Sequence, residues 1–310
     1  MKQKRTIKNI AASIRERLNN RARELGEDFN LILSRYAVER FLHRLSRSRY
    51  ANEFILKGAQ LFALWTEIPH RVTRDLDLLR EGDSSLAKLE TIFRAICDQP
   101  VEEDDGIEFL ANTVKGEAIR ERAEYGGWRI RIGYRIATAR NTLQVDVGFG
   151  DVVIPRPQVV EFPSLLDFSA IHLKAYSRET VIAEKFQAIV MLGIANSRMK
   201  DFYDISILAQ TFHFDGATLL KAIAATFKRR KTVLPGEMPV ALTADFAKDQ
   251  VKQKIWQGFL NKNRLNPVKA DFIAVIKILR EFLMPPTLAL IHGQKFKQIW
   301  LPKGPWQEIV

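Results

Sequence analysis

The chain has 310 residues, of which 46% are hydrophobic and 27% charged, and its net charge is +12. These values are typical of a globular protein with one large or two ordinary domains, and no apolar run approaches the ~20 residues of a membrane-spanning helix. The N-terminus lacks the apolar segment of a secretory signal, and the single Cys97 excludes an internal disulfide or a cysteine-based zinc site, so we expect a cytoplasmic protein.

The first 100 residues predict two helices, then alternating strands and helices. Apolar residues recur at three-to-four spacing from residue 10 to about 45, and Gly26-Glu27-Asp28 interrupts this pattern, so two helices are expected. Short apolar runs predict strands at residues 54–56 and 71–79. Helical spacing predicts helices at 59–65 and 85–97.

The remaining residues predict a pair of strands followed by helices only. Apolar and polar residues alternate at 128–132 and 143–149, which indicates an antiparallel pair, and 152–154 could add an edge strand ended by Pro155. Helical spacing then covers 178–192, 201–211, 217–227, 248–260 and 269–283. We therefore predict an α+β fold in residues 1–163 and an all-helical domain in residues 164–310.

Two aspartates in the predicted strand 71–79 are the strongest candidates for chemistry. Residues two apart on a strand share a face, so Asp75 and Asp77 would present two carboxylates side by side. A divalent cation such as Mg²⁺ or Mn²⁺ would relieve their repulsion, although two solvated acids on an exposed strand would give the same pattern. Gly58, between a strand and a helix, could offer backbone N–H groups to a phosphate, and Asp146 could supply a third metal ligand or be an ordinary polar strand residue.

The order of these motifs resembles a known family. The chain resembles the AbiEii-type (MenT-like) nucleotidyltransferase toxins in five motifs that occur in the same order. These motifs are Phe54-Ile55-Leu56-Lys57-Gly58, Thr73-Arg74-Asp75-Leu76-Asp77, Val145-Asp146-Val147, Glu184-Lys185 and Lys200-Asp201-Phe202-Tyr203-Asp204. These belong to the DNA polymerase β-like nucleotidyltransferase superfamily. The resemblance runs from about residue 14 to 208. The chain has Gly58-Ala59 where the superfamily usually has Gly-Gly or Gly-Ser, so a serine contact to phosphate would be lost.

The resemblance implies a polymerase β-like core in which a mixed sheet carries Asp75 and Asp77, and it implies roles for individual residues. It implies metal binding by Asp75, Asp77 and Asp146 and nucleotide binding by Lys57, Gly58 and Lys185. It also implies that Asp201 is an active-site acid, with Asp204 holding a basic side chain or the start of its helix. From the residues alone, Lys185 lies among apolar helix neighbours and could equally extend past them to water. Either Asp146 or Asp201 could deprotonate the attacking hydroxyl.

The charge distribution bears on the acceptor. Residues 1–50 carry a net +8 and residues 221–310 a net +10, which leaves −6 for the centre, as expected if basic ends bind a polyanion. Residues 227–231 and the helix around Trp256 mix cations with aromatics, as single-stranded nucleic acid sites do, although Trp256 and Phe259 could simply be core residues. The expected function is transfer of a nucleotide from an NTP to RNA. The resemblance implies that the acceptor is the 3′ end of tRNA and that the protein is a toxin with a cognate antitoxin. A protein or small-molecule acceptor, or an inactive RNA- or partner-binding module, is the alternative.

Overall fold

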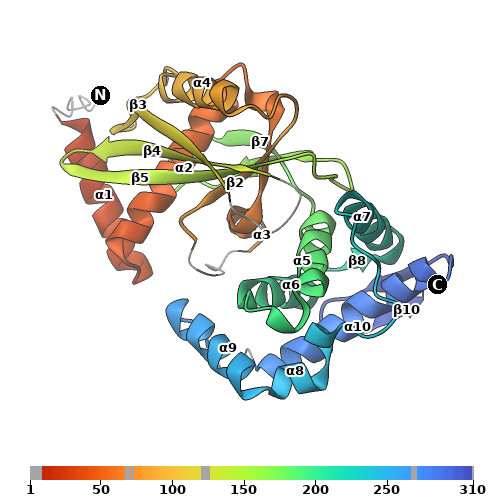
Figure 1. Cartoon of the computed structure of the whole chain (residues 1–310). Coiled ribbons are helices and arrows are strands. Elements are labelled where there is room, and N and C mark those ends of the chain that lie inside the picture. Colours follow the sequence, from red (N-terminus) through yellow and green to blue (C-terminus); the bar gives the residue numbers. More distant parts are fainter. Residues whose placement is uncertain (1–8, 67–70, 72, 120–125, 267–270, 309–310) are drawn as a thin grey trace. The chain divides into compact units, whose positions relative to one another are not determined.

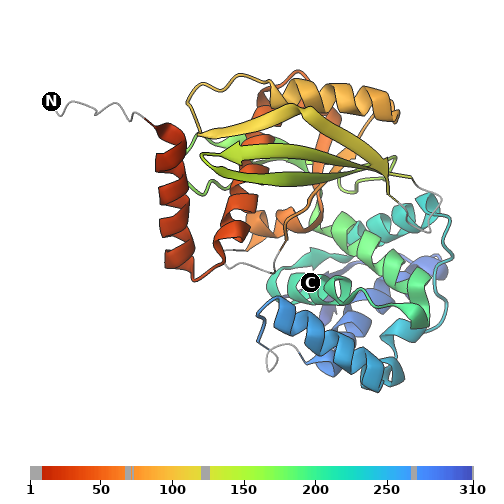
Figure 2. The ribbon, with the colours of Figure 1, turned by 60° about the vertical axis from the view of Figure 1, so that its left-hand side comes forward.

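The computed structural model describes residues 9–66, 71, 73–119, 126–266 and 271–308. It divides the chain into a first unit, residues 1–150 with 158–175, and a second unit, residues 151–157 with 176–310 (Figures 1 and 2). This division differs from the predicted boundary after residue 163, because two strands beyond residue 157 pair within the sheet of the first unit.

The first unit begins with the two predicted helices, α1 (Ile10–Leu25) and α2 (Phe29–Arg47). Gly26 ends α1 in the left-handed region at φ 64°, a conformation that costs glycine little. The Asp28 side chain then accepts a hydrogen bond from the Leu31 N–H and caps the start of α2. The helix break predicted at residues 26–28 is therefore confirmed, and it results from local capping.

A seven-stranded mixed sheet forms the centre of the first unit, as predicted. Its order is β3-β4-β5-β2-β1-β7-β6, in which β2 is parallel to β5, β1 is parallel to β7, and the other neighbours are antiparallel. The strands are β1 (Phe54–Lys57), β2 (Leu76–Arg80), β3 (Ile107–Ala118), β4 (Trp128–Ile136), β5 (Ala139–Phe149), β6 (Gln158–Phe162) and β7 (Ile171–Ala175).

Aromatic contacts hold helices α2 and α4 (Leu86–Cys97) against the sheet. Phe41 of α2 and Phe93 of α4 stack with ring centroids 5.5 Å apart, and Phe93 also meets Phe54 of β1 edge-on at 5.9 Å. Short turns of helix complete the unit: η1 (Ala51–Glu53), η2 (Gly58–Leu61) and α3 (Phe62–Trp65). The apolar core thus lies between these helices and the sheet.

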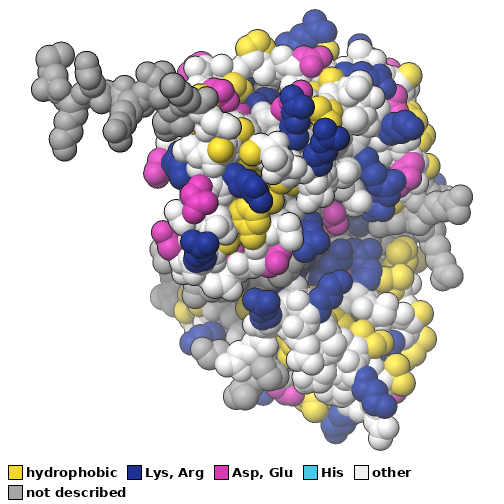
Figure 3. All heavy atoms as spheres, turned by 90° about the vertical axis from the view of Figure 1, so that its left-hand side faces the viewer, with side chains coloured by type: hydrophobic (Ala, Val, Ile, Leu, Met, Phe, Trp, Pro, Cys, Tyr) yellow, Lys and Arg dark blue, Asp and Glu magenta, His cyan; other side chains and the backbone are white. Residues whose placement is uncertain are grey.

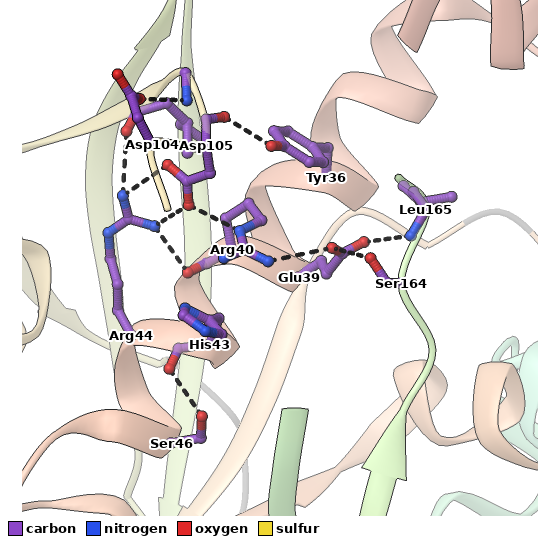
Figure 4. Close-up of polar contacts among 12 residues, drawn as sticks. Tyr36, Glu39, Arg40, His43, Arg44, Ser46, Asp104, Asp105, Ser164 and Leu165 are labelled. Carbon is purple, nitrogen blue, oxygen red and sulfur yellow. Dashed lines mark hydrogen bonds and ion pairs between the residues drawn. The ribbon is translucent and has the colours of Figure 1, made fainter. Parts of the chain in front are cut away.

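Buried ion pairs also hold α2 in place, as Figure 4 shows. Arg40 and Arg44 both bind the Asp105 carboxylate, with shortest N–O distances of 2.8 and 2.7 Å, and the carboxylate is only 1% exposed. Glu39 accepts hydrogen bonds from the Ser164 hydroxyl at 2.8 Å and the Leu165 N–H at 2.7 Å. Burial raises the pKa of Asp105, but the two guanidiniums outweigh it and lower that pKa overall. This network joins α2 to the turn before β3 and to the segment between β6 and β7.

Several sequence predictions for the sheet were incomplete or wrong. The strand predicted at 71–79 is β2, which begins at Leu76, so Asp75 precedes the strand; Val72 lies outside the described residues. Residues 152–154 form no strand. The prediction missed β3, β6 and β7. β3 pairs with the next strand β4, and β6 pairs with the next strand β7, so both pairs join consecutive strands. The β7 sequence Ile171-His172-Leu173-Lys174-Ala175 alternates apolar and polar residues and was therefore a usable signal.

The second unit is mainly helical but also contains a small sheet. Helices predicted near 178–192, 201–211 and 217–227 are confirmed, whereas the one predicted at 248–260 is α9 with a short α8 before it. The helices are α5 (Arg178–Leu192), η3 (Gly193–Ala195), α6 (Met199–Thr211), α7 (Gly216–Arg229), η4 (Val240–Leu242), α8 (Ala244–Lys248), α9 (Gln250–Lys262) and α10 (Phe272–Ile291). The all-helical prediction was wrong in one respect: β8 (Phe214–Asp215), β9 (Gln298–Trp300) and β10 (Trp306–Glu308) form a sheet in the order β10-β9-β8.

Helix α10 continues beyond the end predicted at residue 283, through Pro285 and Pro286. Because Pro286 has no N–H, the Phe282 carbonyl four residues earlier loses its helical donor. The Trp306 indole N–H donates to that carbonyl at 3.1 Å instead. Trp306, which lies 24 positions after Phe282, therefore replaces the hydrogen bond that Pro286 cannot make. Residue 269, where this helix was predicted to begin, lies outside the described residues. Among the described residues, no helix is long and apolar enough to cross a membrane.

Candidate active site

The clearest feature of the candidate site is the close approach of Asp77 to Gly58. Gly58 follows β1 with φ at +73°, in the left-handed region that strains other residues. A Cβ atom built on Gly58 would lie 2.0 Å from Oδ2 of Asp77 and 2.6 Å from its Cγ. The Asp77 carboxylate thus occupies the space that any other side chain at position 58 would fill. Both backbone conformation and space require glycine here.

Four charged residues form a row across adjacent strands of the sheet. Lys57 of β1 is opposite Asp77 of β2, Asp77 is in register with Asp146 of β5, and Asp146 is opposite Arg129 of β4. Residues in register on neighbouring strands project to the same face. The two aspartates, predicted from separate motifs, therefore lie side by side between two cations.

Arg129 holds Asp146 in a bidentate ion pair. Its Nε donates to Oδ1 at 2.9 Å and its Nη2 to Oδ2 at 2.8 Å. Hydrogen bonding to this carboxylate raises the pKa of Arg129 further above its usual value. The sequence analysis did not identify Arg129, although its place in the alternating strand Trp128-Arg129-Ile130-Arg131-Ile132 was a usable signal once the register was known.

Asp75 precedes β2 and is exposed, while Asp77 is half-buried. Gln60, in the turn after Gly58, donates its side-chain amide N–H to the Asp75 carbonyl at 3.2 Å, which links the two segments. Within the described residues, no group of three or more His, Cys, Asp or Glu could hold a metal ion. Mg²⁺ is commonly held by only one or two carboxylates together with substrate phosphates, so the pair Asp75 and Asp77 suits such an ion.

In the second unit, Lys185 of α5 binds two buried aspartates of α6. Its Nζ lies 2.7 Å from Oδ1 of Asp201 and 2.8 Å from Oδ2 of Asp204, and these carboxylates are 1% and 0% exposed. Arg198 approaches Asp201 at 2.7 Å from the other side. Burial raises the pKa of Asp201, but Lys185 and Arg198 outweigh it and lower that pKa overall. Asp204 holds a basic side chain, as expected, and so does Asp201.

Several cations proposed for RNA binding serve the second unit internally. Arg230 lies 3.2 Å from both Asp151 and Glu184, and its Nη1 donates to the Gln187 side chain at 3.1 Å. The Lys252 ammonium donates to the backbone carbonyls of Ile194 and Asn196 at 2.6 and 3.0 Å.

The aromatic residues of α9 also belong to the core. Trp256 is completely buried and stacks on Phe272 with ring centroids 4.8 Å apart. Phe259 is half-buried and meets Tyr203 at 5.6 Å. The interpretation of Trp256 as a base-stacking residue was therefore wrong.

The mixed sheet, with Asp75 directly before β2, Asp77 on β2 and Asp146 on the parallel β5, defines a nucleotidyltransferase-type core. Residues 40–277 match the family described as "Nucleotidyl transferase AbiEii toxin, Type IV TA system". Since this match spans most of the 310 residues, the chain belongs to the AbiEii nucleotidyltransferase toxins of toxin–antitoxin systems.

Two solved structures match this chain over most of its length. JHP933 from Helicobacter pylori is 14% identical with a TM-score of 0.49, and the alignment covers 86% of this chain and 95% of that protein. A crystal structure titled as a proposed nucleotidyltransferase from H. pylori gives the same identity and TM-score, with 87% of this chain and 100% of that chain covered. Curated protein sequences give no significant match.

Proposed function

We propose that the protein transfers a nucleotide from an NTP to a hydroxyl group of RNA, with a divalent cation held by Asp75 and Asp77. The observation that carries this proposal is the Asp77 carboxylate seated over Gly58, which joins the acid to a glycine turn at the end of β1. When bound, Mg²⁺ or Mn²⁺ supplies positive charge that stabilises the triphosphate oxygens during transfer. The family match and the hard oxygen donors support this assignment.

The residues around this acid pair suit a triphosphate. We assign a phosphate to the backbone N–H groups of the turn that begins at Gly58, and Lys57 adds a positive charge beside Asp77 in the row. By family membership we also assign Lys185, in the second unit, to nucleotide binding. Asp201 and Asp204 are then positioning residues, because they fix the Lys185 ammonium.

Asp146 suits the role of proton acceptor better than Asp201 does. Both acids are ion-paired, but the Asp201 side chain is 1% exposed whereas that of Asp146 is 19% exposed, so Asp146 is the more open to a substrate hydroxyl. Asp146 is in register with Asp77, one strand away from the candidate metal pair. Arg129 would then orient Asp146 for this step.

The basic surface supports RNA as the acceptor. Figure 3 shows Lys and Arg side chains distributed over the face that it presents. Of the basic run at 228–231, Lys228 and Lys231 are exposed and Arg229 is half-buried, so these three could meet phosphates while Arg230 has an internal role. By family membership we propose a tRNA 3′ end as the acceptor and an antitoxin as a protein partner.

Transfer can be tested by incubating the protein with each α-³²P-labelled NTP, magnesium and total RNA. We expect label in the RNA fraction, and loss of at least about 10³-fold in rate for Asp77→Asn, since a metal-holding acid contributes several kcal/mol. Asp98→Asn, which changes a carboxylate at the end of α4 in the same unit, is the matched control and should retain full activity. Label in protein or in a small molecule would favour the other acceptors. No turnover of any NTP, or an active Asp77→Asn variant, would refute the proposal.

A further inference from the structure

The first unit contains a hollow of about 360 Å³ beside Asp75 that the proposed metal and phosphate contacts do not use. Residues before β2 and on β4 and β5 line it, among them Arg74, Asp75, Arg131, Tyr134, Asn141 and Gln144. This volume is at the small end of the range for ligand pockets, large enough for one nucleotide. Every residue that lines it belongs to the first unit.

The lining of this hollow is polar and cationic. Arg74 and Arg131 supply two guanidiniums, which suit phosphate, and Asn141 and Gln144 supply amide donors and acceptors, which suit a base or ribose. Tyr134 is only 3% exposed, and its buried hydroxyl has no hydrogen-bond partner in the described part of the chain. Leaving such a hydroxyl unsatisfied costs free energy that a polar ligand could recover. These groups together indicate a nucleotide-like ligand.

The position of the hollow distinguishes the two substrates of the proposed reaction. In the sheet order, β1 and the Gly58 turn lie on one side of β2, whereas β5 and β4 lie on the other. In phosphoryl transfer the attacking and leaving oxygens are roughly in line on opposite sides of the phosphorus. If the triphosphate tail lies at Gly58, the attacking hydroxyl must approach from the side of β5 and β4, where the hollow is.

We propose that this hollow binds the terminal nucleotide of a single-stranded RNA acceptor, with its 3′-hydroxyl directed towards Asp75. The inference rests on the proposed function and names the acceptor subsite for it. The hydroxyl oxygen bonds to the α-phosphorus of the NTP, and the bond from that phosphorus to the bridging oxygen breaks, which releases pyrophosphate. The hydroxyl proton passes to Asp146. The acceptor is thereby extended by one nucleotide.

Binding of a probe RNA can test the subsite without turnover. The full chain would be titrated into a 5′-fluorescein single-stranded oligoribonucleotide with a free 3′-hydroxyl, and anisotropy would be recorded at several salt concentrations. Arg131→Ala and Arg135→Ala form a matched pair, because both arginines lie on β4, are about half exposed (50% and 51%) and pair with a β3 glutamate, but only Arg131 lines the hollow.

We expect Arg131→Ala to weaken RNA binding about 3- to 10-fold and to flatten the salt slope by about 0.7, the effect of one phosphate contact, while Arg135→Ala has neither effect. Tyr134→Phe should weaken binding about 3-fold, the lower end for one hydrogen bond. Binding of α,β-methylene NTP analogues, measured by calorimetry, should be unchanged in all three variants.

Two results would overturn the inference: equal RNA affinities for Arg131→Ala and Arg135→Ala, or a loss of analogue binding in Arg131→Ala and Tyr134→Phe. An absence of RNA binding by the wild type would also overturn it. If the expected binding differences occur but the wild type transfers no nucleotide, the proposed function fails while the hollow is supported as an RNA subsite.

Discussion

Replacing Lys185 with methionine should destabilise the second unit strongly at neutral pH. The substitution keeps an unbranched side chain but removes the ammonium that lies within 2.8 Å of both Asp201 and Asp204. Those carboxylates are at most 1% exposed, so water cannot replace the lost charge without rearrangement. Arg198 still neutralises Asp201, which leaves Asp204 as the main site of the penalty.

The magnitude follows from the burial of the three groups. Removing one partner of a buried ion pair costs about 3–5 kcal/mol. Because Lys185 is 14% exposed and Arg198 remains, we expect the lower end, about 3 kcal/mol. With a urea m-value of about 2 kcal/mol/M, the unfolding midpoint should fall by about 1.5 M.

The stability penalty of Lys185→Met should decrease as the pH falls, whereas the wild type itself loses stability as the pH falls. In the wild type the pKa of Asp201 is lowered, so its ion pairs stabilise the fold above about pH 4, the unfolded value, and this contribution is lost as the pH falls. In Lys185→Met the Asp204 carboxylate loses its contact with the Lys185 ammonium, which disfavours its charged form. Its penalty is then largest at neutral pH and disappears as the acid becomes protonated. The difference between the two proteins should therefore shrink as the pH decreases from 7.5 to 4.5.

Urea unfolding at these two pH values, followed by tryptophan fluorescence, is a suitable assay because Trp256 and Trp300 are buried in this unit. Lys200→Met, an exposed lysine of α6, is the matched control and should change stability by less than about 0.5 kcal/mol. Adding Asp204→Asn to Lys185→Met should restore more than half of the loss. A Lys185→Met protein as stable as the wild type at pH 7.5 would refute the reasoning.

Three other substitutions test the first unit. Gly58→Ala should displace the Asp77 carboxylate, since its Cβ would lie 2.0 Å from Oδ2, and reduce transfer about 100-fold or more (~3 kcal/mol) in the labelled-NTP assay, whereas unchanged activity would show that this approach is unimportant. Arg129→Gln should lower kcat with little change in the KM for NTP, and Arg129→Lys should restore only part of kcat because lysine cannot form the bidentate pair with Asp146; full rescue by lysine would contradict the orienting role. Burial, followed by the charge of Arg40, lowers the pKa of His43 to about 4, so the stability that neutral His43 gives the fold is present above about pH 6.5 and is lost as the pH falls to 4. His43→Gln should therefore lessen the loss of stability in acid by up to about 3 kcal/mol. Identical urea midpoints for the variant and the wild type across this pH range would contradict this prediction.

The sequence predicted those elements and groupings that depend on neighbours along the chain. The break between α1 and α2 follows from Gly26 and Asp28, whose cap contacts involve residues within four positions. Strong apolar periodicity likewise identified α4. The family was also predicted, because its signal is a set of short motifs in a fixed order.

Only the tertiary structure decided which distant residues meet. Register across β4, β5 and β2 brings Arg129, Asp146 and Asp77 into one row, and register depends on pairing that no local pattern specifies. The parallel pairing of β7 with β1, in which Leu56 lies opposite Ala175, likewise adds β7 and its partner β6 to the sheet of the first unit. Similarly, the apolar neighbours of Lys185 on α5 suggested a lysine extended to water, whereas the packing of α5 and α6 places two buried carboxylates at its ammonium. Helical periodicity specifies which face of a helix is buried, but the partner on that face comes from another part of the chain.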